Sequence, residues 1–586
     1  MRWRLDSVDQ DAAATLARGL NIPGAPLIAQ LLVASGITGP EAAERFLHPS
    51  LEHLHSPYLM LGMQAAVDRI AAAIANKEDI LVYGDYDVDG TTAIVILKTA
   101  IELCGGTVDF HVPHRIREGY GMRDEVIERA AAAGVRLIIS VDTGIRAFEA
   151  AETAHRLGVE LIVTDHHLPG PDGVPRALAV LNPNQAGCGY PCKDVCGAGV
   201  AFKVAQALLE KEGRARLLPS FLKVVALATI ADSVPLRGEN RVFARLGLDG
   251  LRAPVNLGLK ALFQVAQLDG SRPVTATDIA FRVAPRINAA GRMDVARDVI
   301  DLFTVKDATR TREIAARLDQ LNAERQNEER RILDEIFKRF EENPALADPY
   351  CLVIDGEGWH RGVIGITATR VVERYHRPTL VVACENGEAH GSGRSIPAFH
   401  LLEAMESCAE LFTRFGGHAH ACGFALPVDR LPELRERLDR FARGRLTAAD
   451  LEPVLEVDGE LPIEQITPQF FAALQQLEPF GVENPEPVFS ARAVRLAAPP
   501  RFIKDKHVRM KLGAGRKNDE EARSSSGNGG WRNAVVYDAM GWRLGDSARQ
   551  AELIAGDSLD IAFTLDQNHH PEFGGMELSL LDFRKV

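Results

Sequence analysis

The chain has 586 residues, of which 46% are hydrophobic, 25% charged and 6% aromatic. This composition is ordinary for a globular protein and excludes a collagen-like, disordered or membrane-spanning class. At roughly 150 residues per domain, the length predicts about three or four domains. The formal net charge of −13 by itself argues against a nucleic-acid partner, because proteins that neutralise phosphates usually carry a basic excess.

The first residues contain no apolar core of a secretory signal, and no stretch reaches the roughly 18 uninterrupted apolar residues of a spanning helix. The sequence therefore predicts a cytoplasmic protein. Eight cysteines are too sparse for a disulfide scaffold in so long a chain. Cys188, Cys192 and Cys196 are evenly spaced, but the spacing fits no usual zinc pattern and no fourth ligand is near. A structural metal there is the weaker interpretation.

The first half of the chain predicts helices followed by an α/β domain. Apolar residues spaced three and four apart predict that residues 1–78 are an N-terminal helical region that serves packing. Between residues 79 and 305, short apolar runs alternate with helical stretches, which is typical of a parallel sheet with crossover helices. The fold class is therefore α/β, and the clearest buried strands are 80–83, 137–141 and 161–163.

The second half predicts three further units. Residues 306–345 form a long polar connecting helix with an intermittent apolar stripe, although a kinked pair of packed helices is an equal alternative. Residues 346–450 show a second α/β pattern. Residues 451–586 contain five short alternating segments, the number expected for a small β-barrel of the OB type. Within them, residues 514–530 are almost free of apolar side chains and predict a disordered loop insertion.

Acidic and imidazole side chains follow the three predicted strands of the first α/β domain. Asp85, Asp87 and Asp89 follow the first strand, Asp142 the second, and Asp165 with two histidines the third. The carboxyl ends of parallel strands form the ligand crevice, so these groups are expected to converge. Any one such aspartate could be an ordinary helix N-cap, but the whole set is not explained in that way.

So many carboxylates in one crevice require cations. Two unit charges at about 4 Å repel by about 4 kcal/mol at an effective dielectric constant near 20. Carboxylates with imidazole favour Mn²⁺ or Mg²⁺, and no thiolate lies in these motifs to favour zinc or copper. Two ions bridged by one aspartate are the usual arrangement for in-line phosphoryl displacement. The residues alone therefore predict phosphoester hydrolysis.

Three motifs carry these groups: GDYDVDG at 84–90, VDTG at 141–144 and TDHH at 164–167. In this order they resemble the first three motifs of the DHH phosphoesterase superfamily. Further segments narrow the resemblance to the RecJ family of single-strand-specific exonucleases, among them RINAAGRM (286–293), GSGRS (391–395), GGHAHACGFAL (416–426) and EPFGVENPEPVF (478–489). The resemblance implies a DHH catalytic domain at 79–305, a DHHA1 domain at 346–450 and an OB domain at 451–586.

The resemblance also assigns roles to individual side chains. The implied metal ligands are Asp85, Asp87, Asp89, Asp142, His166 and Asp232. Asp142 would bridge the two ions and belong to the catalytic groups, whereas Asp85 would ligate or orient a ligand. His167 resembles the catalytic histidine, which contacts the scissile phosphate or protonates the leaving oxygen. A ligand role for His167, or a ring tied into the crevice wall, remains open.

A second set of residues resembles the substrate-binding groups of the family: Arg115, Arg286, Arg292, Ser392, Arg394 and His418. Ser392 and Arg394 would surround an anion with a hydroxyl and a guanidinium, with backbone N–H groups nearby. For each arginine, an ordinary surface salt bridge remains the alternative.

The acidic net charge of the whole chain conceals a basic segment in the OB region. Residues 488–517 hold nine Arg or Lys against one acid, so this segment is +8 while the rest of the chain is −21. Its predicted DNA contacts are Arg501, Lys504, Lys506, Arg509 and Lys511, with Phe502 and Trp531 as stacking candidates. The KNDEE run of the 514–530 insertion would repel a DNA strand, so we expect the insertion to project away from the strand.

The activity that the resemblance implies is single-strand-specific 5′ to 3′ digestion of DNA to mononucleotides with two Mn²⁺ or Mg²⁺ ions, in DNA repair and recombination. It also implies a single-strand-binding protein and a RecQ-type helicase as partners, and we expect a monomer. One alternative is a DHH phosphodiesterase acting on short oligonucleotides or cyclic dinucleotides. The other is a non-catalytic single-strand-binding replication factor.

Overall fold

The computed structural model describes every residue except 115–117, 120, 269, 293–295, 515–534 and 569–573. Its first sheet is entirely parallel, with strand order β3-β2-β4-β5-β6. The strands are β2 (Asp79–Tyr83), β3 (Thr107–His111), β4 (Leu137–Val141), β5 (Glu160–Thr164) and β6 (Ala179–Leu181). The predicted parallel α/β sheet is therefore confirmed.

Both faces of this sheet are covered by helices. Consecutive side chains of a strand point to opposite faces, so apolar residues of one strand pack against both layers. Ile80 and Val82 of β2 pack against one layer, and Leu81 and Tyr83 against the other. The first layer contains α4 (Met63–Asn76), α5 (Val88–Leu103), α8 (Gly197–Lys211) and α9 (Leu218–Ala231), and the second contains α6 (Asp124–Ala132) and α7 (Phe148–Arg156). The continuous apolar runs of the strands are explained by this double burial.

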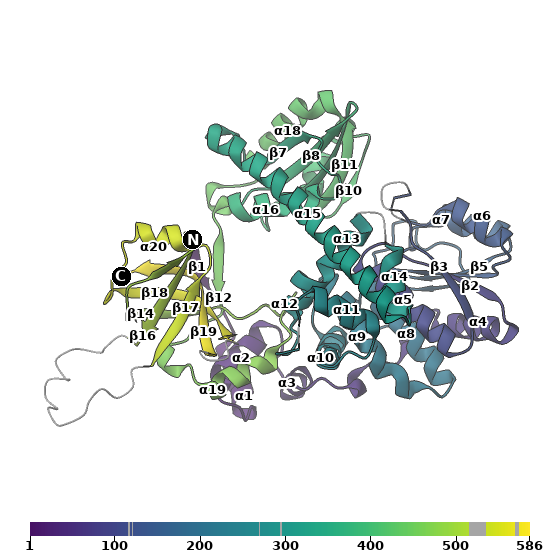
Figure 1. Ribbon diagram of the computed structural model, residues 1–586, viewed down its shortest axis with the longest axis horizontal. Coiled ribbons are helices and arrows are strands. Elements are labelled where there is room, and N and C mark those ends of the chain that lie inside the picture. Colours follow the sequence, from purple (N-terminus) through teal and green to yellow (C-terminus); the bar gives the residue numbers. More distant parts are fainter. Residues whose placement is uncertain (115–117, 120, 269, 293–295, 515–534, 569–573) are drawn as a thin grey trace.

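The N-terminal region contributes to two different cores. Helix α4 packs under the parallel sheet. In contrast, α1 (Gln10–Gly19), α2 (Ala25–Ala34) and α3 (Pro40–Leu47) share one apolar core with the C-terminal strands. Strand β1 (Arg2–Leu5) also pairs in parallel with β12 (Val454–Val457). The start of the chain therefore belongs mainly to the same body as its end (Figure 1).

Further helices extend the first α/β domain and lead to the second one. They are α10 (Gly238–Leu251), α11 (Leu257–Val265), α12 (Ala276–Asp278), α13 (Ala284–Arg292) and α14 (Arg297–Thr304). Next comes α15 (Ala308–Glu342), a single helix of 35 residues whose N-cap Asp307 accepts hydrogen bonds from Thr309 N and Arg310 N. Ile314 and Leu318 pack in the first domain, and Ile332 and Ile336 in the second. The connecting helix is therefore one helix and not a kinked pair.

The second α/β domain lies at the far end of α15 (Figure 1). Its sheet has the order β10-β11-β9-β8-β7. The strands are β7 (Leu352–Glu357), β8 (Thr379–Glu385), β9 (Glu388–Arg394), β10 (Arg414–Gly417) and β11 (Ala421–Pro427). Only β7 and β8 are parallel. Helices α16 (Ile364–Tyr375), α17 (Leu401–Glu406) and α18 (Leu431–Arg443) cover the sheet.

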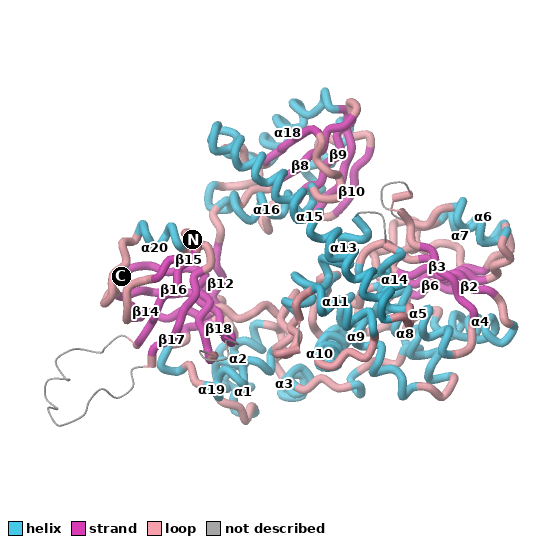
Figure 2. Tube along the Cα trace, viewed as in Figure 1, coloured by secondary structure: helices cyan, strands magenta, loops and turns pink. Residues whose placement is uncertain are grey.

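The C-terminal strands close into a ring. Strand β14 (Phe489–Leu496) pairs with both β16 (His507–Gly513) and β18 (Ser558–Asn568), and β17 (Val536–Gly541) pairs with β16 and with β19 (Gly575–Lys585). Pairing of β18 with β19 completes the circuit. The ring that these residues form therefore has five strands, the number that the sequence predicts. The short β15 (Arg501–Ile503) and α20 (Gly545–Gln550) lie at the end of the ring opposite α1, α2 and α19 (Pro468–Leu474) (Figure 2).

No single helix among the described residues is long and apolar enough to cross a membrane. One bent pair, 51–59 with 63–76, passes such a test by length and composition only.

Candidate metal centre

Three aspartates, Asp85, Asp87 and Asp89, follow β2 at the carboxyl edge of the sheet. Asp87 is the N-cap of α5, and its carboxylate accepts a hydrogen bond of 3.0 Å from Gly90 N. The Asp89 carboxylate accepts hydrogen bonds from Gly197 N at 2.6 Å and Ala198 N at 2.8 Å. These two N–H groups begin α8, so helix N-termini favour negative charge in this crevice.

Asp142 follows β4 in a strained backbone conformation. Its φ is +58°, its backbone N donates to Thr164 O at 3.0 Å, and it is only 2% exposed. This left-handed conformation costs a non-glycine residue roughly 1 kcal/mol or more. The Oδ1 atom is buried and accepts no hydrogen bond from the described residues. A buried carboxylate with an acceptor atom that makes no hydrogen bond is suited to bind a metal ion.

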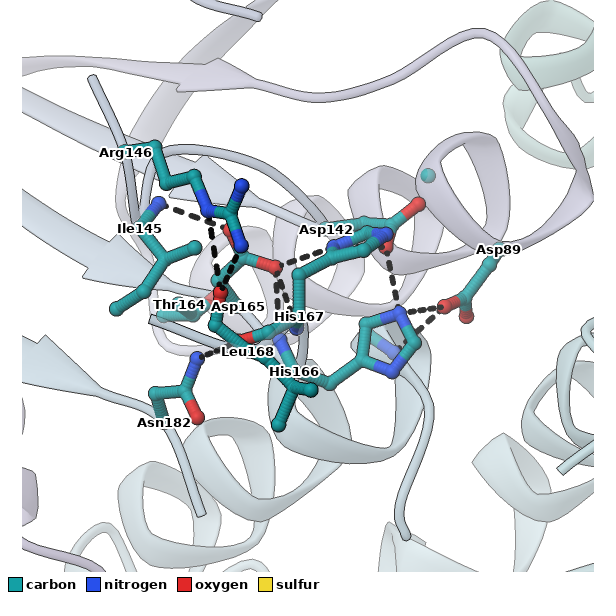
Figure 3. A network of polar contacts seen from close by, with 12 residues as sticks. Asp89, Asp142, Ile145, Arg146, Thr164, Asp165, His166, His167, Leu168 and Asn182 are labelled. Atoms are coloured by element: carbon teal, nitrogen blue, oxygen red, sulfur yellow. Dashed lines mark hydrogen bonds and ion pairs between the residues drawn. The ribbon is translucent and has the colours of Figure 1, made fainter. Parts of the chain in front are cut away.

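The imidazole of His166 lies beside carboxylates from three different elements, and two of them, Asp89 and Asp142, are labelled in Figure 3. Its Nε2 atom lies 3.2 Å from Asp142 Oδ1, 3.7 Å from Asp89 Oδ2 and 3.8 Å from Asp232 Oδ2. Asp232 is the C-cap of α9. One ring nitrogen can direct a proton toward only one of these oxygens. An arrangement of several acceptors around one imidazole nitrogen therefore suits a shared cation.

Three donor sets in this crevice could each hold a metal ion, with donor atoms within 4.8 Å of one another. They are Asp142 with His166 and His167, Asp89 with His166 and Asp232, and Asp85 with Asp87 and Asp142. Asp142 belongs to two of the sets, as a bridging ligand would. All six ligands implied by the resemblance are therefore gathered in one place.

The protonation preferences of these groups fit divalent cations. Burial raises the pKa of the Asp142 carboxyl well above its ordinary value, and repulsion from Asp89 and Asp87 adds to the shift. Burial and the same neighbours raise the pKa of Asp232 to about 9. Burial lowers the pKa of His166, so its ring is neutral near pH 7 and can donate a lone pair. Divalent ions would supply the charge that makes these carboxylates stable without protons.

Asp165 orients the second histidine, a role that the sequence did not suggest. Its Oδ1 atom accepts a hydrogen bond from His167 Nδ1 at 2.8 Å, and its Oδ2 atom accepts from Ile145 N at 2.9 Å. Burial acts to lower the pKa of His167, but the hydrogen bond to Asp165 and the charges of Asp165, Asp89 and Asp87 together raise it above its ordinary value. The His167 side chain is 43% exposed against 16% for His166. The ring is thus tied to the wall through Nδ1 while remaining open to the crevice.

Two asparagines after β6 hold the backbone of His166 and His167. Asn182 Nδ2 donates to His167 O at 2.8 Å, and Asn184 Nδ2 donates to His166 O at 2.9 Å. The signal in the sequence was the LNPNQ run directly after a strand. These bonds fix the backbone from which both imidazoles project, as supporting residues around metal ligands generally do.

Gly197 is required for the acids to approach one another. A Cβ atom at this position would lie 2.6 Å from Asp142 Cβ and 2.8 Å from Asp142 Oδ1. We expect Gly197→Ala to weaken Mn²⁺ binding by about 10- to 100-fold while the thermal midpoint changes little, because alanine suits a helix better than glycine. Calorimetric titration with Mn²⁺ and thermal melting measure the two effects. Gly189→Ala, where a Cβ meets nothing within 4 Å, is the control, and unchanged Mn²⁺ affinity in Gly197→Ala would contradict the expectation.

The second α/β domain presents an arginine that no acid neutralises among the described residues. Arg394, at the end of β9, donates to Ser392 Oγ at 3.2 Å and Gly393 O at 2.8 Å. Burial lowers the pKa of its guanidinium. A Cβ atom on Gly365 in the first turn of α16 would lie 2.9 Å from Ser392 Oγ and 3.2 Å from Arg394 Nη2. Ser392, Arg394 and the N-terminus of α16 therefore meet, a combination suited to phosphate.

The other predicted phosphate contacts lie in different surroundings. His418 is exposed in the β10–β11 turn, beside the strand in which Ala421 pairs with Arg394. Arg292 Nη1 donates to Gly362 O of the second domain at 2.5 Å. Arg286 points elsewhere: its Nε donates to Asp319 of α15 at 2.8 Å, which corresponds to the salt-bridge alternative. Arg115 lies outside the described residues.

The predicted DNA contacts of the ring lie on its β15–β16 hairpin. Arg501 and Arg509 are cross-strand neighbours, and Lys504 and Lys506 flank the turn. Arg509 and Lys511 lie 3.5 and 3.9 Å from carboxylate oxygens of Asp538, which partly neutralises them. Trp531 and residues 515–530 of the insertion are outside the described residues.

An exposed tryptophan that was not predicted from the sequence lies beside this hairpin. Trp542 is 58% exposed, and its ring makes an edge contact with His507 at 5.0 Å between centroids. Phe502 is 41% exposed, with the guanidinium of Arg549 4.6 Å from its ring centre. The signal was the GWR turn after a predicted strand.

The fold and the crevice together define a class of protein, a metal-dependent phosphoesterase with a DHH domain. Three family models match: DHH family, N-terminal domain (residues 79–229), DHHA1 domain (348–444) and RecJ OB domain (457–582). The chain belongs to the RecJ family of single-stranded-DNA-specific exonucleases. This confirms the family, the α/β fold and the order of DHH, DHHA1 and OB domains inferred from the sequence.

Several curated relatives and solved structures are similar along most of the chain. The RecJ exonuclease of Bacillus subtilis strain 168 is 41% identical over 489 residues, which are 83% of this chain and 61% of that protein. RecJ of Dickeya dadantii is 36% identical over 503 residues, 83% of this chain and 86% of that protein. This chain thus spans under two thirds of the length of the Bacillus relative.

The structural comparison also bears on the metal. The crystal structure of RecJ from Thermus thermophilus in complex with Mn²⁺ matches with a TM-score of 0.82 and 29% identity, covering 100% of this chain and 80% of that chain. The same protein with Mg²⁺ matches with a TM-score of 0.76 and 27% identity, covering 100% and 78%. With the donor sets of the crevice, these structures support the predicted Mn²⁺ or Mg²⁺ cofactor.

Proposed function

We propose that this chain is a metal-dependent exonuclease that digests single-stranded DNA from its 5′ end and releases mononucleotides. The observation that carries the proposal is the crevice in which Asp142 is common to two metal donor sets. The non-catalytic alternative loses its support because each carboxylate and imidazole needed for two ions is present and converges. Polarity, and a role in repair and recombination, come to the chain from its family.

The residues of the crevice divide between ion binding and proton transfer. Asp85, Asp87 and Asp142 would hold one ion, and Asp89, His166 and Asp232 the other, with Asp142 between them. When bound, two Mn²⁺ or Mg²⁺ ions supply Lewis-acid charge and water activation for phosphodiester hydrolysis. The strained backbone of Asp142 and the α8 N–H groups on Asp89 hold the ligands in place before substrate arrives.

His167 is suited to protonate the leaving 3′ oxygen. Its Nδ1–H donates to Asp165, which orients the ring and raises its pKa, so the ring holds a second proton more readily. That proton, on Nε2, is directed away from the Asp165 wall. A positioned acid of this kind contributes about 10²- to 10⁴-fold to rate.

The second domain supplies the group that would select a 5′ end. Arg394 and Ser392 of β9, beside the N-terminus of α16, would bind a terminal 5′-phosphate, because a guanidinium with no carboxylate partner among the described residues can pair with phosphate oxygens. Arg292 connects the two α/β domains through its hydrogen bond to Gly362 O. His418, on the neighbouring turn, and Arg115 remain proposed contacts of the same substrate.

The OB ring would hold the strand that has not yet been digested. Arg501, Lys504 and Lys506 are its proposed phosphate contacts, and Arg509 and Lys511 add charge that Asp538 reduces. Trp542 and Phe502 offer exposed ring faces beside these cations. This is the usual combination for holding a single strand without sequence preference.

Removal of the exposed indole tests this role of the ring. We expect Trp542→Ala to weaken binding of a fluorescent single strand by about 1–3 kcal/mol, the usual contribution of one stacked base. The measurement is fluorescence anisotropy with a chelator present, so that no cleavage occurs. Trp542→Phe, which retains a ring, is expected to bind nearly as well as the wild type, and equal affinity of wild type and Trp542→Ala would remove the residue from the DNA site.

The proposal includes the organisation and setting of the protein. We propose the DHH domain at 79–305, the connecting helix at 306–345, the DHHA1 domain at 346–450 and the OB domain at 451–586, acting as a monomer in the cytoplasm. A single-strand-binding protein and a RecQ-type helicase are proposed partners, on the basis of the family alone.

Digestion of end-labelled DNA tests the function. We expect a 5′-phosphorylated single strand labelled at its 5′ end to release labelled mononucleotide at once with Mn²⁺ or Mg²⁺, and a 3′-labelled strand to release it last. A blunt duplex and a reaction with chelator should remain intact. Activity confined to a dinucleotide would instead favour the oligonucleotide phosphodiesterase.

A further inference from the structure

A buried arginine, Arg241 of α10, joins the catalytic domain to the body that carries the OB ring. It is 2% exposed and forms no salt bridge among the described residues. Its guanidinium instead donates to backbone carbonyls: Nε to Phe46 O at 2.5 Å, Nη1 to Leu477 O at 3.0 Å, and Nη2 to Gln476 O and Glu478 O, each at 3.0 Å. Four carbonyls from two distant segments therefore share one side chain.

The chemistry of this site requires a guanidinium. Phe46 is in the last turn of α3, and Gln476 and Leu477 belong to the 3₁₀ turn Gln475–Leu477, so the cation lies at the negative ends of two helical segments. The Phe46 ring lies 3.5 Å from the guanidinium carbon and covers it. Burial lowers the pKa of Arg241 to about 9, so the group stays charged near pH 7. A lysine ammonium, as a point charge on a flexible stem, cannot reproduce the planar set of bonds.

All these carbonyls belong to the OB body. Phe46 and Leu477 are both part of the apolar core that α1, α2 and α3 share with β14 and β16. Arg241 itself lies on α10, close in sequence to Phe243 and Ala244, which belong to the core of the catalytic domain. The side chain therefore crosses from one body to the other and holds the latter by its backbone.

Two cavities adjoin the junction between the two bodies near Arg241. One of about 870 Å³ has Arg245, Phe480 and Leu565 in its lining. A smaller one of about 190 Å³ is lined by residues that include Leu31 and Arg237. The Arg237–Glu483 ion pair at 3.3 Å is about half exposed on both sides. Arg241 is, in contrast, a deeply buried polar contact at this junction.

The same stretch of chain carries a metal ligand. Asp232 ends α9, and only the five residues 233–237 separate it from α10, which contains Arg241. Within that link, Leu236 N donates to Val482 O of the OB body at 3.0 Å. The OB body is thus attached to the catalytic domain directly beside one of the groups proposed to hold the ions.

We propose that Arg241 is a positioning residue that fixes the OB body relative to the metal centre, so that a strand held by the ring reaches the crevice in the correct register. The inference rests on the proposed function and deepens it. Its consequence is specific: loss of Arg241 should impair digestion of strands long enough to contact the ring, and should spare short substrates. Misplacement of a remote group can cost about 100-fold in rate.

The test compares Arg241→Met with the wild type on two substrates. One is a single strand of about 40 nucleotides, longer than the roughly 4 to 16 nucleotides that an OB domain covers, and the other has about 4 nucleotides. For Arg241→Met we expect the long-strand KM to rise about tenfold and fewer nucleotides to be released per binding event. The kcat and KM for the short substrate, and the affinity for Mn²⁺, should stay at wild-type values.

Two further variants separate positioning from loss of structure. Arg245→Met removes a neighbouring cation that also donates to Glu478 O, at 3.0 Å, but faces the large cavity, and we expect the long-strand KM to stay near wild type. Arg241→Lys keeps the charge and part of the bonding, so it should show an intermediate KM. If Arg241→Met does not fold, hydrogen exchange on Arg241→Lys replaces it: residues 43–47 and 475–478 should exchange faster than in the wild type while β2 and β4 do not.

The outcomes distinguish this inference from the proposed function. Equal effects on long and short substrates, or an unchanged long-strand KM with unchanged exchange at 43–47 and 475–478, would overturn the role of Arg241. Failure of the wild type to digest either substrate would instead overturn the proposed function.

Discussion

Asp142→Ala is expected to abolish hydrolysis of single-stranded DNA, with a loss of about 10³-fold or more in kcat. Asp142 belongs to the donor set with Asp85 and Asp87, and its Oδ1 atom lies 3.2 Å from His166 Nε2 of the set with Asp89 and Asp232, so its removal should affect both proposed ions. Metal charge in such sites stabilises the transition state by several kcal/mol, and each 1.36 kcal/mol corresponds to a tenfold change in rate. The measurement is initial release of mononucleotide from a labelled strand in Mn²⁺.

The matched control is Asp109→Ala, an exposed aspartate on β3 of the same sheet, which should keep full activity. Binding of a single strand in chelator should be nearly the same for wild type and Asp142→Ala, because the OB ring lies outside the crevice. Mn²⁺-dependent cleavage at a rate near wild type in Asp142→Ala would show that the ions bind elsewhere.

His167→Ala is expected to lower kcat by about 10²- to 10⁴-fold, the usual contribution of a positioned general acid. The residue is held by Asp165 and is more exposed than His166, which suits contact with substrate rather than burial among the ligands. Because an acid is needed only for a poor leaving group, a strand with sulfur in place of the bridging 3′ oxygen should recover much of the loss. Kinetics on the two substrates with Mn²⁺ measure this.

A titration with Mn²⁺ distinguishes the remaining interpretation of His167. If the ring acts as an acid, His167→Ala should bind Mn²⁺ nearly as tightly as the wild type. A large fall in Mn²⁺ affinity, with no recovery on the sulfur substrate, would make His167 a ligand instead. His155→Ala, an exposed histidine of α7, should change neither measurement.

The parallel sheet and its crevice could be predicted from the sequence because the signal is local. Continuous apolar runs such as 137–141 mark strands buried on both faces, and the residue after each run must lie at the ligand edge. Asp232 is different, since it follows a helix and no periodic pattern indicates that α9 ends in the crevice. Only the resemblance to the family suggested it.

Residues that act through the backbone left weaker signals. Asn182 and Asn184 hold the backbone of the two histidines by bonds that depend on how the segment after β6 meets the segment after β5. Gly197 is needed because Asp142 packs against it, and that contact spans 55 residues of sequence. Arg241 is a further example, because its hydrogen-bond partners are backbone carbonyls, which no side-chain pattern in the sequence indicates.

The direction of a side chain on a helix was also beyond the sequence. Arg286 and Arg292 are six residues apart on α13, which at 3.6 residues per turn places them on different faces. One pairs with Asp319 of α15 and the other reaches Gly362 of the second domain. Likewise, the apolar faces of α1 to α3 were visible, but not their partner more than 400 residues later in the chain.

Anomalous diffraction from crystals grown with Mn²⁺ tests the central claim, that Asp142 bridges two ions in this crevice. The account predicts two adjacent anomalous peaks, one beside Asp85, Asp87 and Asp142 and the other beside Asp89, His166 and Asp232, with Asp142 touching both. Peaks elsewhere in the protein, or a single peak that does not touch Asp142, would contradict it.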